Sequence, residues 1–137
     1  VINYSKKDFA KKVLELTNGK GVSVVYDGVG KTTYDKSIEC LKLRGTMVSF
    51  GNASGPLDPI IVSKSLQPKG IYFVRPALNQ YFTNSEEIQE AANMLFKQIS
   101  SGNVKIEIFK KYKLEDAVQA HKDLEGRKIT GPAVIIP

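Results

Sequence analysis

The sequence predicts an α/β fold in which a parallel sheet is covered by helices on both faces. Segments with helical periodicity alternate along the chain with short strands, and nearly every residue of those strands is apolar. Strands buried on both faces have this composition, which is typical of parallel sheets. At 137 residues, 42% of them hydrophobic and 25% charged, the chain is long enough to bury one modest core and too apolar for a disordered protein.

The first half of the chain carries the elements that define this sheet. Residues 1–4 are predicted to be the end of a strand, and Ser5 followed by Asp8 resembles a capping box that starts a helix over about residues 6–17. The next elements alternate as strand, helix, strand and strand, over residues 22–26, 32–43, 46–50 and 71–74. A loop and a short helical or irregular stretch separate the last two strands, at residues 51–56 and 58–66.

The longest predicted helix opens the second half. Thr83 and Glu86 form a capping box at its start, and Gly102 lies just past its end. Its apolar residues fall on one face, namely Ile88, Ala91, Ala92, Leu95, Phe96 and Ile99. The tail is expected to form a strand, a helix closed by a glycine, and a strand, over residues 105–109, 114–125 and 133–136.

The composition excludes several classes of protein. No apolar stretch approaches the roughly 20 residues that a membrane-spanning helix needs, and no secretory signal is present, so we expect a soluble, cytoplasmic protein. One Cys and one His exclude a typical structural zinc site within this chain. The net charge of +6 is spread over helix faces on which acidic and basic residues pair at four-residue spacing, which argues against a nucleic-acid partner. Val1 already lies in the first predicted strand, which suggests a piece of a longer chain.

Two potentially reactive side chains are assigned structural roles. Cys40 has no His or Asp at catalytic spacing, and we expect it on a helix, facing the sheet. His121 lies on the apolar side of its helix, beside Val118 and Leu124, which favours a partly buried structural histidine.

The carboxyl ends of the predicted strands carry small and polar residues. These ends are Asn3-Tyr4, Asp27-Gly28-Val29-Gly30, Phe50-Gly51-Asn52 and Arg75-Pro76. Ligands of open parallel sheets bind beyond this edge, and small residues let a ligand approach the backbone closely. The sequence therefore predicts a nucleotide-sized ligand in a cleft at the strand ends.

Five segments resemble, in the same order and at nearly the same spacing, the zeta-crystallin-like quinone oxidoreductases of the medium-chain dehydrogenase/reductase superfamily. They are VINY, VVYDGVG, TMVSFGNASGP, YFVRPAL and GRKITGPAVIIP. The resemblance implies a Rossmann-like, doubly wound parallel sheet that is incomplete, because the first two strands and the glycine-rich phosphate loop of that fold are absent from this chain. It also implies that residues 1–102 belong to the NADPH-binding domain and that residues 103–137 return to pack on a separate catalytic domain.

The resemblance further implies a set of cofactor-binding residues, Tyr4, Val29, Phe50, Gly51, Asn52 and Arg75. Tyr4 would lie against the adenosine ribose and donate a hydrogen bond to its 2′-phosphate. Val29 would flank the nicotinamide ribose, and residues 50–52 would flank the nicotinamide. Arg75 would reach the cofactor, because Pro76 fixes an extended backbone before it that directs the guanidinium outward. Each residue also has a structural interpretation: a strand-end tyrosine in water, turn glycines, core packing of the phenylalanine, and a surface arginine.

The implied activity is transfer of reducing equivalents from NADPH to a quinone or another electron-poor alkene or carbonyl. A longer enzyme that contains this chain would carry it out, and the chain alone is expected to be inactive. No catalytic residue and no metal ligand is assigned. The resemblance implies a homodimer joined through the strand at residues 71–74. Two alternatives remain open. One is a non-catalytic role, as a structural crystallin or a nucleic-acid binder, and the other is a related zinc-free enoyl reductase or alcohol dehydrogenase.

Overall fold

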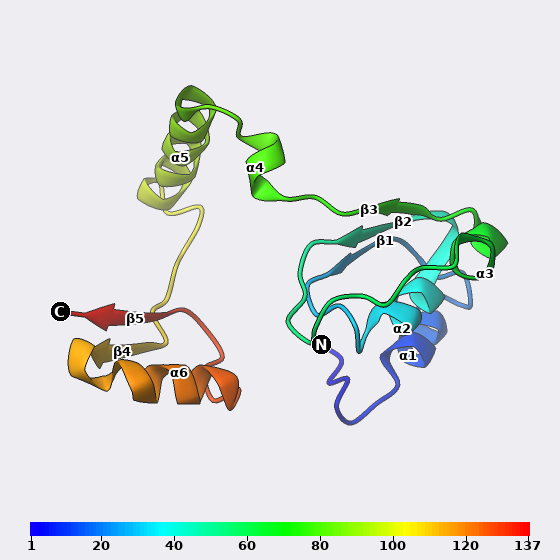
Figure 1. Cartoon of the computed structure of the whole chain (residues 1–137), viewed down its shortest axis with the longest axis horizontal. Helices are drawn as coiled ribbons and strands as arrows, with labels where there is room; N and C mark the ends of the chain where they lie inside the picture. The colour runs from blue at the N-terminus through cyan, green and yellow to red at the C-terminus, as the bar shows by residue number, and fades with distance from the viewer. The chain divides into compact units, whose positions relative to one another are not determined.

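The computed structural model describes residues 1–137, which form two compact units, Val1–Tyr81 and Phe82–Pro137 (Figure 1). Each unit contains a parallel sheet with helical connections, which confirms the predicted fold class. The boundary at residue 102, which the sequence placed between part of an NADPH-binding domain and a return segment, stays a prediction.

The first unit is built on a three-stranded sheet in the order β1-β2-β3. The strands are β1 (Val22–Asp27), β2 (Leu41–Ser49) and β3 (Tyr72–Val74), and all run parallel. Asp27 pairs with Ser49, and Val48 pairs with Val74, so the three carboxyl ends lie level with one another. The loops that leave these ends therefore start from one edge of the sheet.

Two helices, α1 (Phe9–Leu16) and α2 (Tyr34–Cys40), lie on one side of this sheet (Figure 1). Asp8 is the N-cap of α1, and its carboxylate accepts hydrogen bonds from the backbone N–H groups of Ala10 and Lys11 at 3.1 and 3.2 Å. The prediction that Ser5 starts this helix, with Asp8 as its partner, is therefore wrong, because Asp8 itself is the N-cap. Asp8 also pairs with Lys36 Nζ of α2 at 2.7 Å, which fastens the two helices together.

The helix side of the sheet holds the core, and the opposite face of this unit is bare. Buried Tyr34, Leu41, Met47 and Ile71 form the core cluster. On the other face, side chains that alternate with the buried ones are exposed, namely Val24, Tyr26, Tyr72 and Val74. The sequence predicted helices on both faces, whereas the first unit itself covers only one.

The connection from β2 to β3 fixes the end of α2. It contains a short helix, α3 (Val62–Ser65), and a 3-10 turn, η1 (Gln67–Lys69). The ammonium of Lys69 donates to three backbone carbonyls, those of Ile38, Glu39 and Leu41, at 3.2, 2.8 and 2.7 Å. Two of these carbonyls belong to the last turn of α2 and the third to its C-cap, so one lysine caps α2. A further short helix, α4 (Leu78–Tyr81), follows β3 and was not predicted.

Two boundaries in this unit differ from the prediction. Residues 1–4 form no strand, because a strand needs a neighbour to accept and donate its ladder hydrogen bonds, and none of the three strands pairs with them. The helix predicted to reach residue 43 ends at Cys40, and β2 begins at once. Arg44 adopts a left-handed φ of 58°, and the register between β1 and β2 shifts there, so the predicted turn at Arg44 is an irregularity inside a longer strand.

The second unit combines a long helix with a small parallel sheet. The long helix is α5 (Ser85–Ser100), and the sheet consists of β4 (Lys110–Lys113) and β5 (Ala133–Ile136). A 3-10 turn, η2 (Leu114–Asp116), and α6 (Ala117–Glu125) connect the two strands, as the sequence predicts. The cap of α5 is Asn84, one residue beyond the predicted Thr83, and its partner is Glu87 rather than Glu86.

Two further predictions for this unit are wrong. The strand expected at residues 105–109 lies instead at 110–113, because burial of Tyr112 against α6 selects the segment that pairs with β5, although the apolar run comes earlier. His121 is exposed, since the side of α6 that carries Val118 and Leu124 has no cover in this unit.

Cys40 of the first unit is buried, as predicted, and burial together with the nearby Glu39 raises the pKa of its thiol.

Asp123 of α6 holds the second unit together. Its buried carboxylate accepts hydrogen bonds from Tyr112 Oη at 2.8 Å, Gln119 Nε2 at 2.8 Å and Lys110 Nζ at 3.1 Å, and Lys128 Nζ lies 3.6 Å away. The hydrogen bond from Tyr112, followed by that from Lys110, lowers the pKa of this carboxyl below its ordinary range. The ionised form therefore ties α6 to β4.

We expect Asp123→Asn to lower the urea midpoint of unfolding at neutral pH. Because the folded pKa is depressed, the contribution of the carboxylate is present above the unfolded pKa of about 3.9 and is lost as the pH falls below it. The difference in midpoint between parent and variant should therefore shrink as the pH is lowered from about 6 to about 3. Asp116→Asn is the matched control, since Asp116 is exposed and its side chain makes no cap hydrogen bond. The same pH trend in both variants would contradict this role of Asp123.

Candidate functional site

Two loops at the carboxyl edge of the first sheet are joined along their backbones. The loop after β1 covers residues 28–33, and the loop after β2 covers residues 50–55. Four backbone hydrogen bonds link them: Phe50 N to Asp27 O at 3.0 Å, Ala53 N to Gly28 O at 3.2 Å, Ser54 N to Val29 O at 2.7 Å, and Lys31 N to Gly55 O at 3.3 Å. The second loop is thus held against the first.

Glycines allow the two loops to approach this closely. A side chain at Gly51 would collide with the backbone of Gly28, including its carbonyl oxygen. Gly30 has a φ of +89°, and a Cβ there would lie 2.9 Å from the carbonyl oxygen of Gly55. The sequence assigned these residues to ligand approach or to turn formation, and the structure adds a third reason, which is loop-to-loop packing.

A buried carboxylate orders the first loop. Asp27, at the end of β1, is 4% exposed and accepts hydrogen bonds from Val29 N at 2.8 Å and Gly30 N at 2.9 Å. It also accepts from Thr33 Oγ1 at 2.8 and 2.9 Å and from Ser37 Oγ at 2.8 Å. Burial alone raises the pKa of this carboxyl, but the hydrogen bonds outweigh burial and hold the pKa below its ordinary value.

Arg75 crosses the edge of the sheet. Its Nη1 donates to the carbonyl of Ser49, the last residue of β2, at 2.6 Å. With the Asn52 amide oriented so that its Nδ2 donates to Gly51 O at 2.8 Å, Asn52 Oδ1 accepts from Arg75 Nη2 at 3.3 Å. The guanidinium therefore folds back over β2, and the expectation that Pro76 would direct it outward is wrong.

Five of the six predicted cofactor-binding residues gather at this edge, namely Val29, Phe50, Gly51, Asn52 and Arg75. Tyr4 does not join them through any interaction. Its ring, 47% exposed, lies edge-on to Phe9 of α1 with the centroids 6.3 Å apart.

The edge offers donors to a ligand. The N–H groups of Gly51 and Asn52 donate no hydrogen bond within the chain, whereas Val29 uses both its N–H and its carbonyl internally. Two free N–H groups, an amide and a guanidinium suit the carbonyl or phosphate oxygens of a ligand. The sequence interpretation placed Asp27 at a strand end without giving it a role, and it missed Thr33 and Ser37. A usable signal was the four-residue spacing of Thr33 and Ser37, which puts both hydroxyls on one face of a helix.

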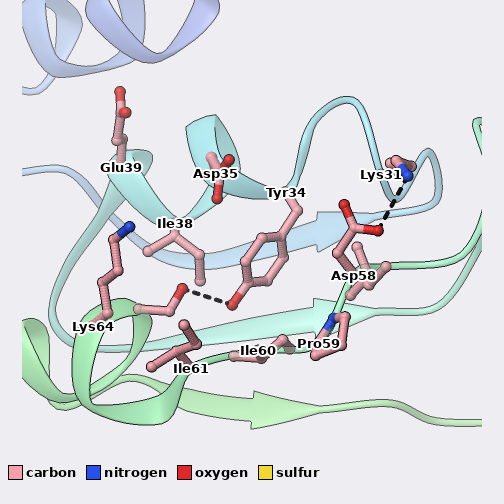
Figure 2. A pocket seen from close by; sticks show the side chains of 12 residues that line it. Lys31, Tyr34, Asp35, Ile38, Glu39, Asp58, Pro59, Ile60, Ile61 and Lys64 are labelled. Atoms are coloured by element: carbon pink, nitrogen blue, oxygen red, sulfur yellow. Dashed lines mark hydrogen bonds and ion pairs between the residues drawn. The ribbon is translucent and has the colours of Figure 1, made fainter.

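Two cavities flank the first sheet. One, of about 510 Å³, contains two of the predicted residues and is lined by Phe50, Arg75, Pro76, Ala77, Leu78, Gln80 and Tyr81. The other, also about 510 Å³, lies between α2 and the stretch after residue 56, away from the six predicted residues (Figure 2). In it the Tyr34 hydroxyl lies 3.0 Å from Ser65 Oγ, and Lys31 pairs with Asp58 at 3.1 Å (Figure 2).

No group of three or more His, Cys, Asp or Glu side chains is placed to hold a metal ion. None of the helices is long and apolar enough to cross a membrane.

Comparison with known proteins gives consistent matches over the whole chain. The family model described as "Zinc-binding dehydrogenase" matches residues 1–135. The chain is 45% identical to the quinone oxidoreductase of Salmonella typhimurium, covering 100% of this chain and 42% of that protein. It is 44% identical to the 2-haloacrylate reductase of a Burkholderia species, covering 99% of this chain and 41% of that protein. The chain thus spans about two fifths of the length of these curated relatives.

A solved structure gives the same picture. The crystal structure of Escherichia coli quinone oxidoreductase complexed with NADPH superposes with a TM-score of 0.92 at 44% identity, covering 100% of this chain and 43% of that one. The fold of this chain is therefore Rossmann-like, as predicted.

We expect Gly51→Ala to destabilise the first unit by about 1–3 kcal/mol, the usual range for overpacking, because the new methyl group meets the Gly28 backbone rather than a flexible side chain. Chemical denaturation measures it. Gly19→Ala is the comparison, since Gly19 has a φ of +77° but open space around it, and should cost about 1 kcal/mol from backbone conformation alone. A smaller loss at Gly51 than at Gly19 would contradict the loop packing.

Proposed function

The chain belongs to the zinc-binding dehydrogenase family, and from that premise we propose that it forms part of the NADPH-binding domain of an oxidoreductase that reduces quinones. The observation that carries the proposal is the carboxyl edge of the sheet, where glycines let two loops pack closely. Two free N–H groups, an amide and a guanidinium lie together at this edge. Asp27 is buried, and its oxygens accept hydrogen bonds from within the chain, so its carboxylate does not compete with a ligand for these N–H groups. We propose no zinc site within this chain, because no group of three or more His, Cys, Asp or Glu side chains is placed to hold a metal ion.

The residues at this edge fit the nicotinamide half of NADPH, which supplies a hydride when it is bound. The N–H groups of Gly51 and Asn52 would hold the carboxamide, and the side chain of Val29 would lie against the ribose. Arg75 would keep its hydrogen bond to Ser49 while its remaining N–H groups face the cofactor. The exposed phenol of Tyr4 would donate to the 2′-phosphate of the adenosine half.

The acceptor would occupy the cavity beside Phe50 and Arg75. Phe50, Leu78 and Tyr81 give this cavity flat or apolar walls without a carboxylate, which suits an aromatic quinone. A second candidate acceptor is an electron-poor alkene, because the 2-haloacrylate reductase is 44% identical to this chain. Steady-state rates with naphthoquinone and with 2-chloroacrylate, measured on the longer protein that contains the chain, would separate the two.

We also propose how the chain is used in a larger assembly. Residues 103–137 would pack on the catalytic domain of a longer enzyme. β3 pairs only with β2, so its other edge is free to pair with β3 of a second copy in a homodimer. The single thiol, Cys40, is buried and unpaired, which suits the reducing cytoplasm.

We expect the longer protein that contains this chain to bind NADPH more tightly than NADH in calorimetry. Tyr4→Phe should weaken NADPH binding about tenfold and leave NADH binding unchanged, because it removes one hydrogen bond to a charged phosphate. Tyr26→Phe is the matched control, an exposed tyrosine on the bare face of the sheet. Arg75→Ala should weaken the binding of both NADPH and NADH. If the protein bound neither nucleotide, the proposed oxidoreductase function would be refuted. Salt-dependent binding of RNA would then favour the non-catalytic alternative.

A further inference from the structure

Asp27 differs from every other carboxylate of the first unit in its surroundings. It is the only buried one, and no lysine or arginine pairs with it. A buried charge without a counter-ion is costly unless hydrogen bonds satisfy it. Here the donors are two backbone N–H groups and two hydroxyls at 2.8–2.9 Å, which leave its oxygens no evident role in contacting a ligand.

The peptide groups that Asp27 holds belong to the first strand-end loop. The carboxylate accepts from the N–H groups of Val29 and Gly30, so it fixes the path of the chain directly after β1. Thr33 Oγ1 and Ser37 Oγ tie the same carboxylate to the start of α2. Loop and helix therefore share one anchor.

Ser54 connects the second loop, residues 50–55, to the part of the first loop that Asp27 holds. The carbonyl of Val29 accepts from both Ser54 N and Ser54 Oγ, each at 2.7 Å. Ser54 Oγ in turn accepts from Thr32 N at 3.0 Å. The peptide of Val29 is thus held by Asp27 on one side and by Ser54 on the other, and the loop that contains Ser54 also contains Gly51 and Asn52.

We propose that Asp27 is a positioning residue for the nicotinamide half of the cofactor: it sets the loop after β1 and, through Val29 and Ser54, the free N–H groups of Gly51 and Asn52. This inference rests on the proposed function. Asp27 touches no ligand itself, and its effect reaches one half of the cofactor only, because Tyr4, on the adenosine side, has no interaction with either loop.

The test uses two halves of NADPH as separate probes. Nicotinamide mononucleotide reports on the nicotinamide side, and adenosine 2′,5′-bisphosphate reports on the adenosine side. Asp27→Asn keeps the size of the side chain but turns an N–H₂ group toward donors. We expect it to weaken binding of nicotinamide mononucleotide and of NADPH about tenfold or more, and to change that of adenosine 2′,5′-bisphosphate by less than about twofold, by calorimetry or NMR titration.

Asp8→Asn is the matched control. Like Asp27, Asp8 accepts hydrogen bonds from two backbone N–H groups and from a side chain, but it lies at the start of α1, outside both loops. This substitution should lower thermal stability, and it should not weaken binding of one probe more than binding of the other. Ser54→Ala, which leaves Asp27 intact, should reproduce part of the loss for nicotinamide mononucleotide, and it serves as the test if Asp27→Asn does not fold.

The outcomes separate this inference from the proposed function. If the parent binds both probes and Asp27→Asn or Ser54→Ala weakens both equally, or neither, the positioning role is refuted and the proposed function stands. The role is also refuted if Asp8→Asn gives the same selective loss. If the parent binds neither NADPH nor its halves, both the proposed function and the positioning role fail.

Discussion

The parallel register of β1, β2 and β3 is the constraint on which the rest of the first unit depends. Because Asp27 lies opposite Ser49 and Val48 lies opposite Val74, three chain segments leave the sheet at one level. The loops after β1 and β2 then run close enough to exchange backbone hydrogen bonds, and Arg75, just after β3, reaches back to the last carbonyl of β2. A shift in register would separate the glycines that now pack against each other.

The sequence predicted best the elements whose stability is local. β1, β5 and α6 lie within a few residues of their predicted positions, since an apolar β-branched run or a helix with a closing glycine determines them by itself. The failures have non-local causes. Residues 1–4 lack a neighbouring strand, and β4 is selected by the burial of Tyr112. β2 begins early because Leu41 already pairs with Val22 of β1.

The candidate site shows the same division. The strand-end pattern was enough to gather Val29, Asn52 and Arg75 at one edge, because parallel strands carry their carboxyl ends together. The direction of the Arg75 guanidinium depends on the carbonyl of Ser49 in the neighbouring strand, which residue types alone do not reveal. The spacing of Thr33 and Ser37 is visible in the sequence, but their common partner, the buried carboxylate of Asp27, is not.

The capping of α2 by Lys69 has a consequence for how local opening of this protein could be followed. The ammonium of Lys69 is occupied by three carbonyls at the end of α2, whereas exposed lysines such as Lys64 keep theirs in water. An amine-acylating reagent can therefore modify Lys69 only after its ammonium has left these carbonyls. The rate at which this one lysine is acylated, relative to its neighbours, thus measures how often the contact between η1 and the end of α2 breaks.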